Sequence, residues 1–191
     1  MAEVKILIEG YATAHRLSGA SCSTITLVRD RGVILVVDPG TLKNPRLLAA
    51  KLKKEGLTPA DVNMVGITHS HLDHYRGIGL FSKAKALDYW GLWQADRLKP
   101  WRKSWPAQGE RIAPHIRLIK TPGHSYDGIT LLVETRKGTV AICGDVFWKK
   151  DFPRSDPYAQ DKKKLKQSRK KVLQSADWVI PGHGKMFKVG K

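Results

Sequence analysis

The motif HSHLDH, at residues 69–74, constrains this chain more than any other feature, because it places three of the seven histidines around one aspartate. In a helix, His69 and Asp73 would share one face, and the other two histidines would point away from them. In an extended segment, His69 and His71 lie on the same side and can bind one ion together. The motif follows a short apolar run, so we predict a loop after a strand. A turn in this loop would direct Asp73 and His74 to a second, adjacent ion.

Three more donor side chains follow apolar segments later in the chain. They are His124, Asp145 and His183, and a glycine directly precedes each of them. Glycine permits sharp backbone turns and a close approach of the chain to a crowded centre. Imidazole and carboxylate ligands suit zinc, and they also suit iron or manganese. The pattern therefore predicts a site for two metal ions, formed by four separate segments of the chain.

Together these residues resemble the signature of the metallo-β-lactamase superfamily of hydrolases. Residues 69–74 match its HxHxDH motif, and the three later donors match its remaining metal positions in the expected order. The Asp-Pro-Gly turn at residues 38–40 also matches. The resemblance implies an α/β fold, namely an αββα four-layer sandwich with the site at one edge of the two sheets. The chain length and the opening residues are most similar to a single-domain group of this superfamily.

The resemblance also implies roles for the site residues. Two Zn²⁺ ions are the expected cofactors, with Mn²⁺ or Fe²⁺ as alternatives. A hydroxide that bridges the ions would attack a carbonyl carbon or a phosphorus atom. Asp73 would be the catalytic residue, which orients this nucleophile and passes on its proton. The implied ligand set is His69, His71 and His124 for one ion, Asp73, His74 and His183 for the other, and Asp145 as the bridge.

The remaining pattern predicts a single domain, residues 1–191, in which helices cover sheets. Residues 89–110 are rich in Trp and basic side chains, and we expect them to be irregular. The predicted helices lie between Pro45 and Gly56, at 75–87 and at 160–174. The predicted strands lie at 4–9, 24–29, 33–37, 62–68, 116–121, 129–135, 139–143 and 178–180.

The composition is that of a globular protein and argues against a membrane-spanning one. Hydrophobic residues make up 41% and charged residues 27% of the chain, as in ordinary globular proteins. No stretch approaches the roughly 18 apolar residues of a membrane span, and acidic residues interrupt the first apolar run, which argues against a signal peptide. Cys22 and Cys143 are expected to be buried free thiols. We therefore expect a cytoplasmic protein with no membrane partner.

Two substrate classes remain open. The net charge of +17 favours a polyanion, although a generally basic, soluble surface would also explain it. Residues 89–111 interleave Trp with basic side chains, which suits base stacking and phosphate contact in nucleic acids, or alternatively covers a sheet. Residues 149–171 form either a phosphate-binding rim or a solvated helix face. The substrates are thus small-molecule esters, thioesters or lactones, or phosphodiesters in RNA or single-stranded DNA. The side chains expected to line the pocket are Tyr75, Arg76, Ser125 and Tyr126.

A different class is a basic nucleic-acid-binding module with structural metals. Structural zinc sites are closed and usually rich in Cys, whereas this ligand set leaves a bridging position open. The antibiotic-hydrolysing lactamases generally carry Cys where this chain has Asp145, so the resemblance also argues against antibiotic hydrolysis. A metal-dependent hydrolase remains the leading interpretation.

Overall fold

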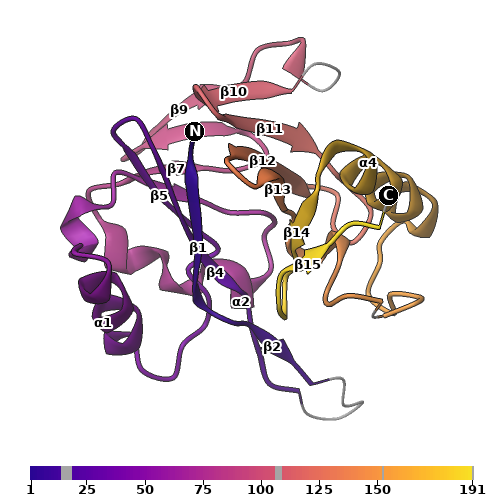
Figure 1. The fold of residues 1–191 in the computed structure, drawn as a ribbon, viewed down its shortest axis with the longest axis horizontal. Helices are drawn as coiled ribbons and strands as arrows, with labels where there is room; N and C mark the ends of the chain where they lie inside the picture. The colour runs from indigo at the N-terminus through magenta and orange to yellow at the C-terminus, as the bar shows by residue number, and fades with distance from the viewer. Residues whose placement is uncertain (14–18, 106–108, 152, 191) are drawn as a thin grey trace.

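The computed structural model describes residues 1–13, 19–105, 109–151 and 153–190, and it consists of two β-sheets between helices (Figure 1). The first sheet has the strand order β1-β4-β5-β6-β7-β8-β9, and the second has the order β10-β11-β12-β13-β14-β15. A small hairpin pairs β2 (Tyr11–Ala12) with β3 (Ser21–Cys22). The strands of the first sheet are β1 (Glu3–Ile8), β4 (Ile25–Asp30), β5 (Val33–Val37), β6 (Met64–Gly66), β7 (Lys85–Leu87), β8 (Gly91–Gln94) and β9 (Arg97–Pro100). Those of the second are β10 (Glu110–Ala113), β11 (Ile116–Lys120), β12 (Ile129–Thr135), β13 (Gly138–Ile142), β14 (Trp178–Ile180) and β15 (Phe187–Lys188).

Helices cover the outer face of each sheet, on opposite sides of the molecule (Figure 1). Helix α1 (Arg46–Lys54) buries Leu48 and Leu52 against the first sheet. Helix α4 (Lys162–Ser175) buries Leu165 and Val172 against the second sheet, as the sequence predicts. The short helices are α2 (Leu72–Tyr75), η1 (Pro59–Asp61), η2 (Arg76–Phe81) and η3 (Gly144–Val146).

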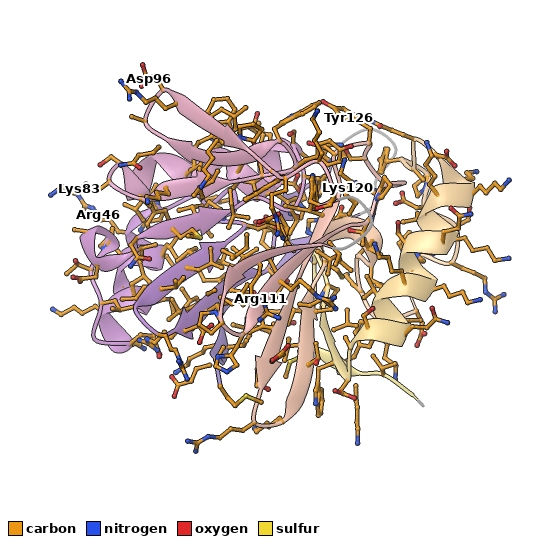
Figure 2. All side chains as sticks on the ribbon, turned by 90° about the horizontal axis from the view of Figure 1, so that it is seen from above. Arg46, Lys83, Asp96, Arg111, Lys120 and Tyr126 are labelled. Carbon is orange, nitrogen blue, oxygen red and sulfur yellow. The ribbon has the colours of Figure 1, made fainter. Side chains whose placement is uncertain are left out.

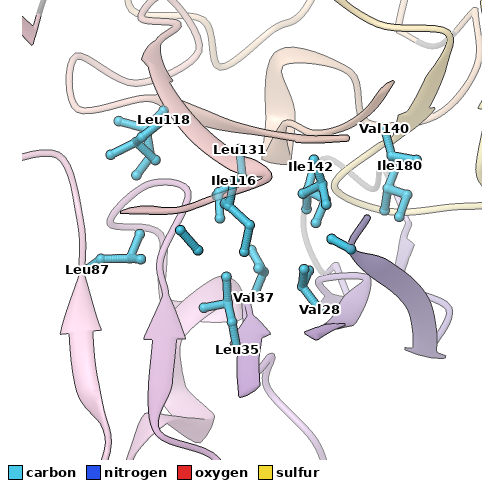
Figure 3. Close-up of a cluster of buried hydrophobic side chains, with 14 of the residues drawn as sticks. Val28, Leu35, Val37, Leu87, Ile116, Leu118, Leu131, Val140, Ile142 and Ile180 are labelled. Carbon is cyan, nitrogen blue, oxygen red and sulfur yellow. The ribbon is translucent and has the colours of Figure 1, made fainter. Parts of the chain in front are cut away.

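The main core lies between the two sheets. Alternating residues of β5, such as Leu35 and Val37, face inward and pack with residues of the other sheet, such as Ile116 and Leu131 (Figure 3). Sheets that are apolar on both faces must be covered on both sides, which the outer helices provide. The result is the expected αββα four-layer sandwich.

Strand direction brings the predicted metal ligands to one edge. In the first sheet, β5, β6 and β7 run parallel, so the residues after these strands lie side by side. In the second sheet, β13 and β14 are parallel, and β11 runs in the same direction because two antiparallel pairings separate it from β13. The donors of residues 69–74, His124, Asp145 and His183 all follow strands of these two sets.

Two predictions for residues 75–110 are wrong. The helix predicted at 75–87 is only the short η2, followed by strand β7, which pairs in parallel with β6. The segment predicted to be irregular contains the β8–β9 hairpin, with Asp96 at its tip (Figure 2). Its turn contains Ala95 at a φ of 53° and no glycine, so it lacks the usual hairpin signal. Strand β7 depends on its parallel pairing with β6, on the other side of the histidine motif, and local propensity does not report such pairing. Strands β8 and β9 form a local hairpin, which the sequence reading missed because its turn lacks the usual residues.

Within the described ranges, no helix combines the length and the apolar character needed to cross a membrane. The expected cytoplasmic location stays a prediction. Both cysteines are free and buried, which confirms the expectation for Cys22 and Cys143.

Candidate metal centre

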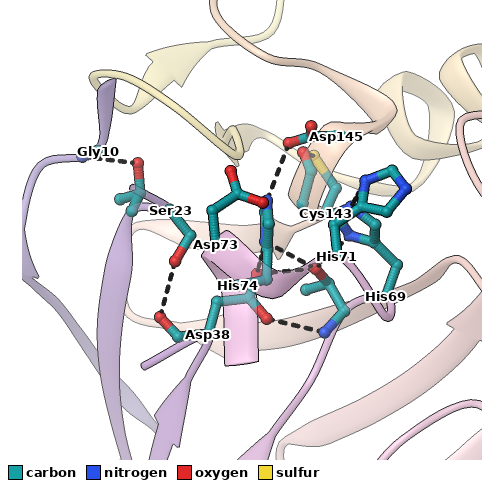
Figure 4. Close-up of polar contacts among 12 residues, drawn as sticks. Gly10, Ser23, Asp38, His69, His71, Asp73, His74, Cys143 and Asp145 are labelled. Carbon is teal, nitrogen blue, oxygen red and sulfur yellow. Dashed lines mark hydrogen bonds and ion pairs between the residues drawn. The ribbon is translucent and has the colours of Figure 1, made fainter. Parts of the chain in front are cut away.

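The histidine motif is extended at its start and helical at its end. His71 has an extended backbone, with φ −91° and ψ 137°, and caps the helix α2, which begins at Leu72. The predicted turn after His71 is therefore the first turn of α2. It separates His69 and His71 from Asp73 and His74, as Figure 4 shows.

All three glycines before the other donors are required by close packing. At Gly123, which has a φ of 136°, a Cβ atom would lie 2.2 Å from the backbone nitrogen of Leu165. A Cβ atom on Gly182 would lie 1.9 Å from Oδ1 of Asp145. Gly144 has a φ of 50°, and a Cβ atom there would lie 2.3 Å from Oγ1 of Thr68. Any larger residue at these positions would displace the ligand loops.

The first cluster of donors comprises His69, His71, His124 and Asp145, whose donor atoms all lie within 4.8 Å of one another. Nδ1 of His71 is 3.0 Å from Nε2 of His69 and 3.0 Å from Nε2 of His124. Nε2 of His124 is 3.3 Å from Oδ2 of Asp145. Nitrogen ligands at about 2.0–2.1 Å from a tetrahedral Zn²⁺ ion would be roughly 3.3 Å apart, so this spacing is close to that of a metal site.

The second cluster comprises Asp73, His74 and His183, again with donor atoms within 4.8 Å. Oδ2 of Asp73 is 3.6 Å from Nε2 of His183. The other carboxylate oxygen of Asp145, Oδ1, lies 3.3 Å from Nε2 of His74 and 3.2 Å from Nε2 of His183. Asp145 thus faces both clusters, in the position that a bridging ligand would occupy.

Two atoms at the junction of the clusters are buried without a hydrogen-bond partner in the described part of the chain. They are Nε2 of His74 and Oδ1 of Asp145. A buried polar atom without a partner costs about 1–3 kcal/mol. A divalent cation would satisfy both atoms, so the residues fit the metal ions that the sequence predicts.

The charges of the site agree with this fit. Burial and the neighbouring His74 lower the pKa of His69 well below its usual value, which favours the neutral imidazole that binds metals. Burial opposes ionisation of Asp145, but His74 and His183 hold the pKa of its carboxyl well below the usual range. Burial likewise opposes a charge on His74, yet Asp38 and Asp145 raise its pKa. The junction therefore attracts a positive charge.

Each of four histidines also has a partner on its outer nitrogen. Nδ1 of His74 lies 2.8 Å from Oδ2 of Asp38, and Nδ1 of His124 lies 2.6 Å from Oδ2 of Asp156. For His183 the partner is the carbonyl oxygen of Cys22, at 3.0 Å, and for His69 it is Oγ1 of Thr68, at 3.1 Å. Such partners set the tautomer and the ring orientation of metal-binding histidines.

Sequence reasoning missed two of the supporting carboxylates. Asp156 lies in the lysine-rich segment, 32 residues after His124, and no local pattern marks it. Asp127 accepts hydrogen bonds from the backbone and hydroxyl of Ser70 and from the hydroxyl of Ser125. It therefore ties the loop of His69 and His71 to the loop of His124.

The side chains expected to line the pocket differ in their surroundings. Ser125 is buried and points to Asp127. Tyr75, Arg76 and Tyr126 are exposed at the same edge as the two clusters. Their roles toward a substrate stay predictions.

The tryptophan-rich segment mostly packs within the fold. Trp93 lies in strand β8, Trp101 packs against the core between the two sheets, and Trp105 is part of that core. The indole nitrogens of Trp93 and Trp101 donate to the carboxylate and the carbonyl of Asp88, respectively, and Trp105 is buried. Trp90 alone of these four rings is more than half exposed, at 52%. Residues 106–108 and 152 of the two basic segments lie outside the described ranges.

The chain belongs to the metallo-β-lactamase superfamily, a family of metal-dependent hydrolases, because the model of this family matches residues 20–120. A curated relative from Xenopus laevis, named metallo-beta-lactamase domain-containing protein 1, is 35% identical over 98% of this chain and 82% of its own length. This similarity confirms the predicted resemblance to a particular group within the superfamily. An N-acyl homoserine lactonase from Bacillus cereus is 28% identical over 69% of this chain and 60% of its own length.

A solved structure confirms the fold. A protein of the metallo-β-lactamase type from Thermotoga maritima superposes with a TM-score of 0.74 over 98% of this chain and 99% of the other. The sequences are 22% identical, so this likeness concerns the fold.

Proposed function

We propose that this protein is a binuclear metal-dependent hydrolase that cleaves an ester, thioester or lactone. The observation that carries the proposal is the pair of donor clusters that Asp145 faces, with two buried atoms at their junction that form no hydrogen bond with the described residues. The seven ligands would be those that the sequence predicts: His69, His71 and His124 for one ion, Asp73, His74 and His183 for the other, and Asp145 for both. Two Zn²⁺ ions are the proposed cofactors, with Mn²⁺ or Fe²⁺ as alternatives.

When bound, two such ions lower the pKa of water to give a nucleophile near neutral pH, and they stabilise the negative charge of the transition state. The residues of the chain provide orientation. Asp73 has a side chain that is 22% exposed, whereas that of Asp145 is 6% exposed. Asp73 is therefore the ligand carboxylate that reaches toward the substrate side, where it would orient the attacking water and accept its proton.

The relatives support a carbonyl substrate. The lactonase from Bacillus cereus acts, by its name, on N-acyl homoserine lactones, and a similar bond in another small molecule would suit the same site. We further propose that residues 1–191 act as one unit, which should unfold in a single cooperative transition.

A second candidate is a nuclease that acts on RNA or single-stranded DNA. The observation in its favour is the position of the lysine-rich helix α4 beside the candidate ligand His124. The backbone nitrogen of Gln160 donates to the carbonyl of His124 at 3.2 Å, and Asp161, the N-cap of α4, donates to the carbonyl of Gly123 at 2.9 Å. A phosphodiester backbone could therefore contact the basic helix and the site together.

One experiment separates the candidates. The bound metal is quantified in the purified chain, and hydrolysis of lactone, thioester, ester, RNA and single-stranded DNA panels is measured with and without a chelator. The hydrolase proposal expects about two ions per chain and chelator-sensitive turnover. Retention of RNA binding without turnover in the metal-loaded chain would instead identify a binding module. Nucleic acid binding should weaken steeply with salt, while turnover of a neutral ester should not.

A further inference from the structure

A cluster of aromatic rings around Lys120 lies at the same edge as the metal centre. Strand β7 is parallel to β6 and ends at Leu87, whose carbonyl accepts from the backbone of Ile67 at 2.9 Å. The residues after β7, including Tyr89 and Trp90, therefore emerge beside the residues after β6, which contain His69. On the facing sheet, Lys120 ends β11 and stands four residues before His124.

The ammonium group of Lys120 lies beside two aromatic rings. Its Nζ donates to the hydroxyl of Tyr89 at 2.8 Å and lies 4.1 Å from the centroid of the Tyr89 ring. It also lies 4.9 Å from the ring of the buried Trp105. These contacts hold the cation in place by cation–π attraction, but they do not neutralise its charge.

The acidic side chains nearby are engaged elsewhere. The carboxylate of Asp88 accepts from the backbones of Trp90 and Gly91 and from the indole of Trp93. Asp127 accepts from two serines. Lys120 forms no salt bridge with any residue in the described ranges. It is thus an oriented, partly exposed cation that lacks an anion.

Exposed rings continue from Lys120 toward the metal centre. The ring of Tyr126 lies 6.5 Å from that of Tyr89 and 6.4 Å from that of Trp90. Tyr126 is 59% exposed and follows His124 by two residues. Figure 2 shows Lys120 and Tyr126 in the same part of the molecule. A flat group lying on these rings would place a neighbouring charge near Lys120.

We propose that Lys120, Trp90 and Tyr126 form a subsite for the part of the substrate that carries a negative charge beside a planar ring. This inference rests on the proposed hydrolase function and specifies its substrate class as small aromatic anions. The ring would stack on Trp90 and Tyr126, and Lys120 would bind the anionic group. Aryl acids and nucleotides share this chemistry, so the test includes one probe of each kind.

Binding of defined probes tests the subsite without turnover. Calorimetry on the full chain, with and without zinc, compares naphthalene-2-sulfonate and adenosine monophosphate with 2-naphthylmethanol, which lacks the charge, and methanesulfonate, which lacks the ring. We expect Lys120→Met to weaken binding of the two aromatic anions about tenfold and to leave 2-naphthylmethanol unchanged. Tyr126→Ala should weaken all three aromatic probes. If the sulfonate binds more tightly, the subsite prefers aryl acids; if adenosine monophosphate binds more tightly, it prefers nucleotides.

The controls separate charge from folding. Lys83→Met removes the same charge from a distant exposed position, as Figure 2 shows, and should bind as the wild type does. Lys120→Arg keeps the cation and should retain most of the affinity. Wild-type affinity of Lys120→Met for both anions, or an equal loss for 2-naphthylmethanol, would overturn the subsite.

A kinetic comparison links the subsite to the reaction. In 4-acetoxybenzenesulfonate, an anionic aryl ester, water adds to the acetyl carbon and the ester C–O bond breaks, which releases acetate, 4-hydroxybenzenesulfonate and a proton. Lys120→Met should raise KM for this anion about tenfold with kcat within about twofold, and should not alter turnover of neutral 4-nitrophenyl acetate. If the wild type hydrolyses no substrate of either kind, the proposed function fails, while the binding experiment still decides the subsite.

Discussion

Two buried aspartates at opposite edges of the sandwich illustrate the difference between a structural carboxylate and a functional one. At the edge far from the metal centre, both oxygens of Asp30 are occupied, because Oδ2 accepts from the backbone of His115 at 2.7 Å and Oδ1 lies 2.8 Å from its Nδ1. At the metal edge, Oδ1 of Asp145 lies 3.3 Å from Nε2 of His74 and 3.2 Å from Nε2 of His183, yet it forms no hydrogen bond within the described ranges. Both side chains are buried beside histidines, so burial and charge alone do not distinguish the two roles. The two aspartates differ in hydrogen bonding, because an oxygen atom of Asp145 forms no hydrogen bond with the described residues.

The largest expected effect tests this comparison directly with the same substitution at both positions. Asp145→Asn should abolish turnover and weaken metal binding by more than the roughly 10–100-fold typical of outer-sphere changes, because a carboxylate shared by two ions is lost. Zinc should then no longer raise the melting temperature, as it should in the wild type. Metal analysis and thermal unfolding with and without zinc measure this. Two tightly bound ions with full activity in Asp145→Asn would refute the assignment.

A smaller effect is expected at Asp156, which contacts the ring nitrogen of His124 that faces away from the metal centre. Asp156→Asn keeps the shape but removes the charge from the 2.6 Å contact with Nδ1 of His124. Metal affinity should fall about 10–100-fold, which competition with a zinc-binding dye measures. Asp161→Asn is the matched control, since Asp161 caps helix α4 and Asn is an equally good cap. Equal affinity in the two variants would mean that Asp156 does not position this ligand.

Asp30→Asn tests whether Asp30 contributes to stability and not to metal binding. Removing a charged partner from two partly buried hydrogen bonds should lower the free energy of unfolding by about 1.5–3 kcal/mol. Denaturant unfolding measures this loss. The stabilisation by zinc should remain as in the wild type, because the substitution lies at the opposite edge. A loss of metal affinity in Asp30→Asn would show that the two edges are not independent.

The smallest expected effect concerns pH. Burial opposes ionisation of Asp30, but hydrogen bonds from His115 hold the pKa of its carboxyl below the usual value. The ionised form therefore favours folding, and its contribution is present above the unfolded value of about 3.9 and is lost as the pH falls through the folded value. Unfolding curves of the metal-free chain between neutral pH and acid should show a smaller acid-induced loss for Asp30→Asn than for the wild type. Identical pH dependence would contradict this role.

Local rules predicted much of the structure from the sequence. The alternation of apolar residues, together with turn residues, located α1, α4 and most strands of both sheets. Local rules failed at β7, whose conformation depends on parallel pairing with β6. They also failed at the β8–β9 hairpin, whose turn contains no glycine. The tryptophans, whose spacing also suited a nucleic-acid platform, mostly pack within the fold. Trp105 belongs to the core between the sheets and Trp101 packs against it, and the indoles of Trp93 and Trp101 donate to Asp88.

By itself, the sequence determined which side chains bear donor atoms, and it set the order of the seven predicted ligands along the chain. These features are local, because each donor follows a short strand and lies beside a glycine or a turn. Only the tertiary structure decided which residues support the donors. Asp127 reaches Ser70 across 57 residues, and Asp156 reaches His124 across 32. Such contacts depend on how two sheets pack, which periodicity and spacing do not encode.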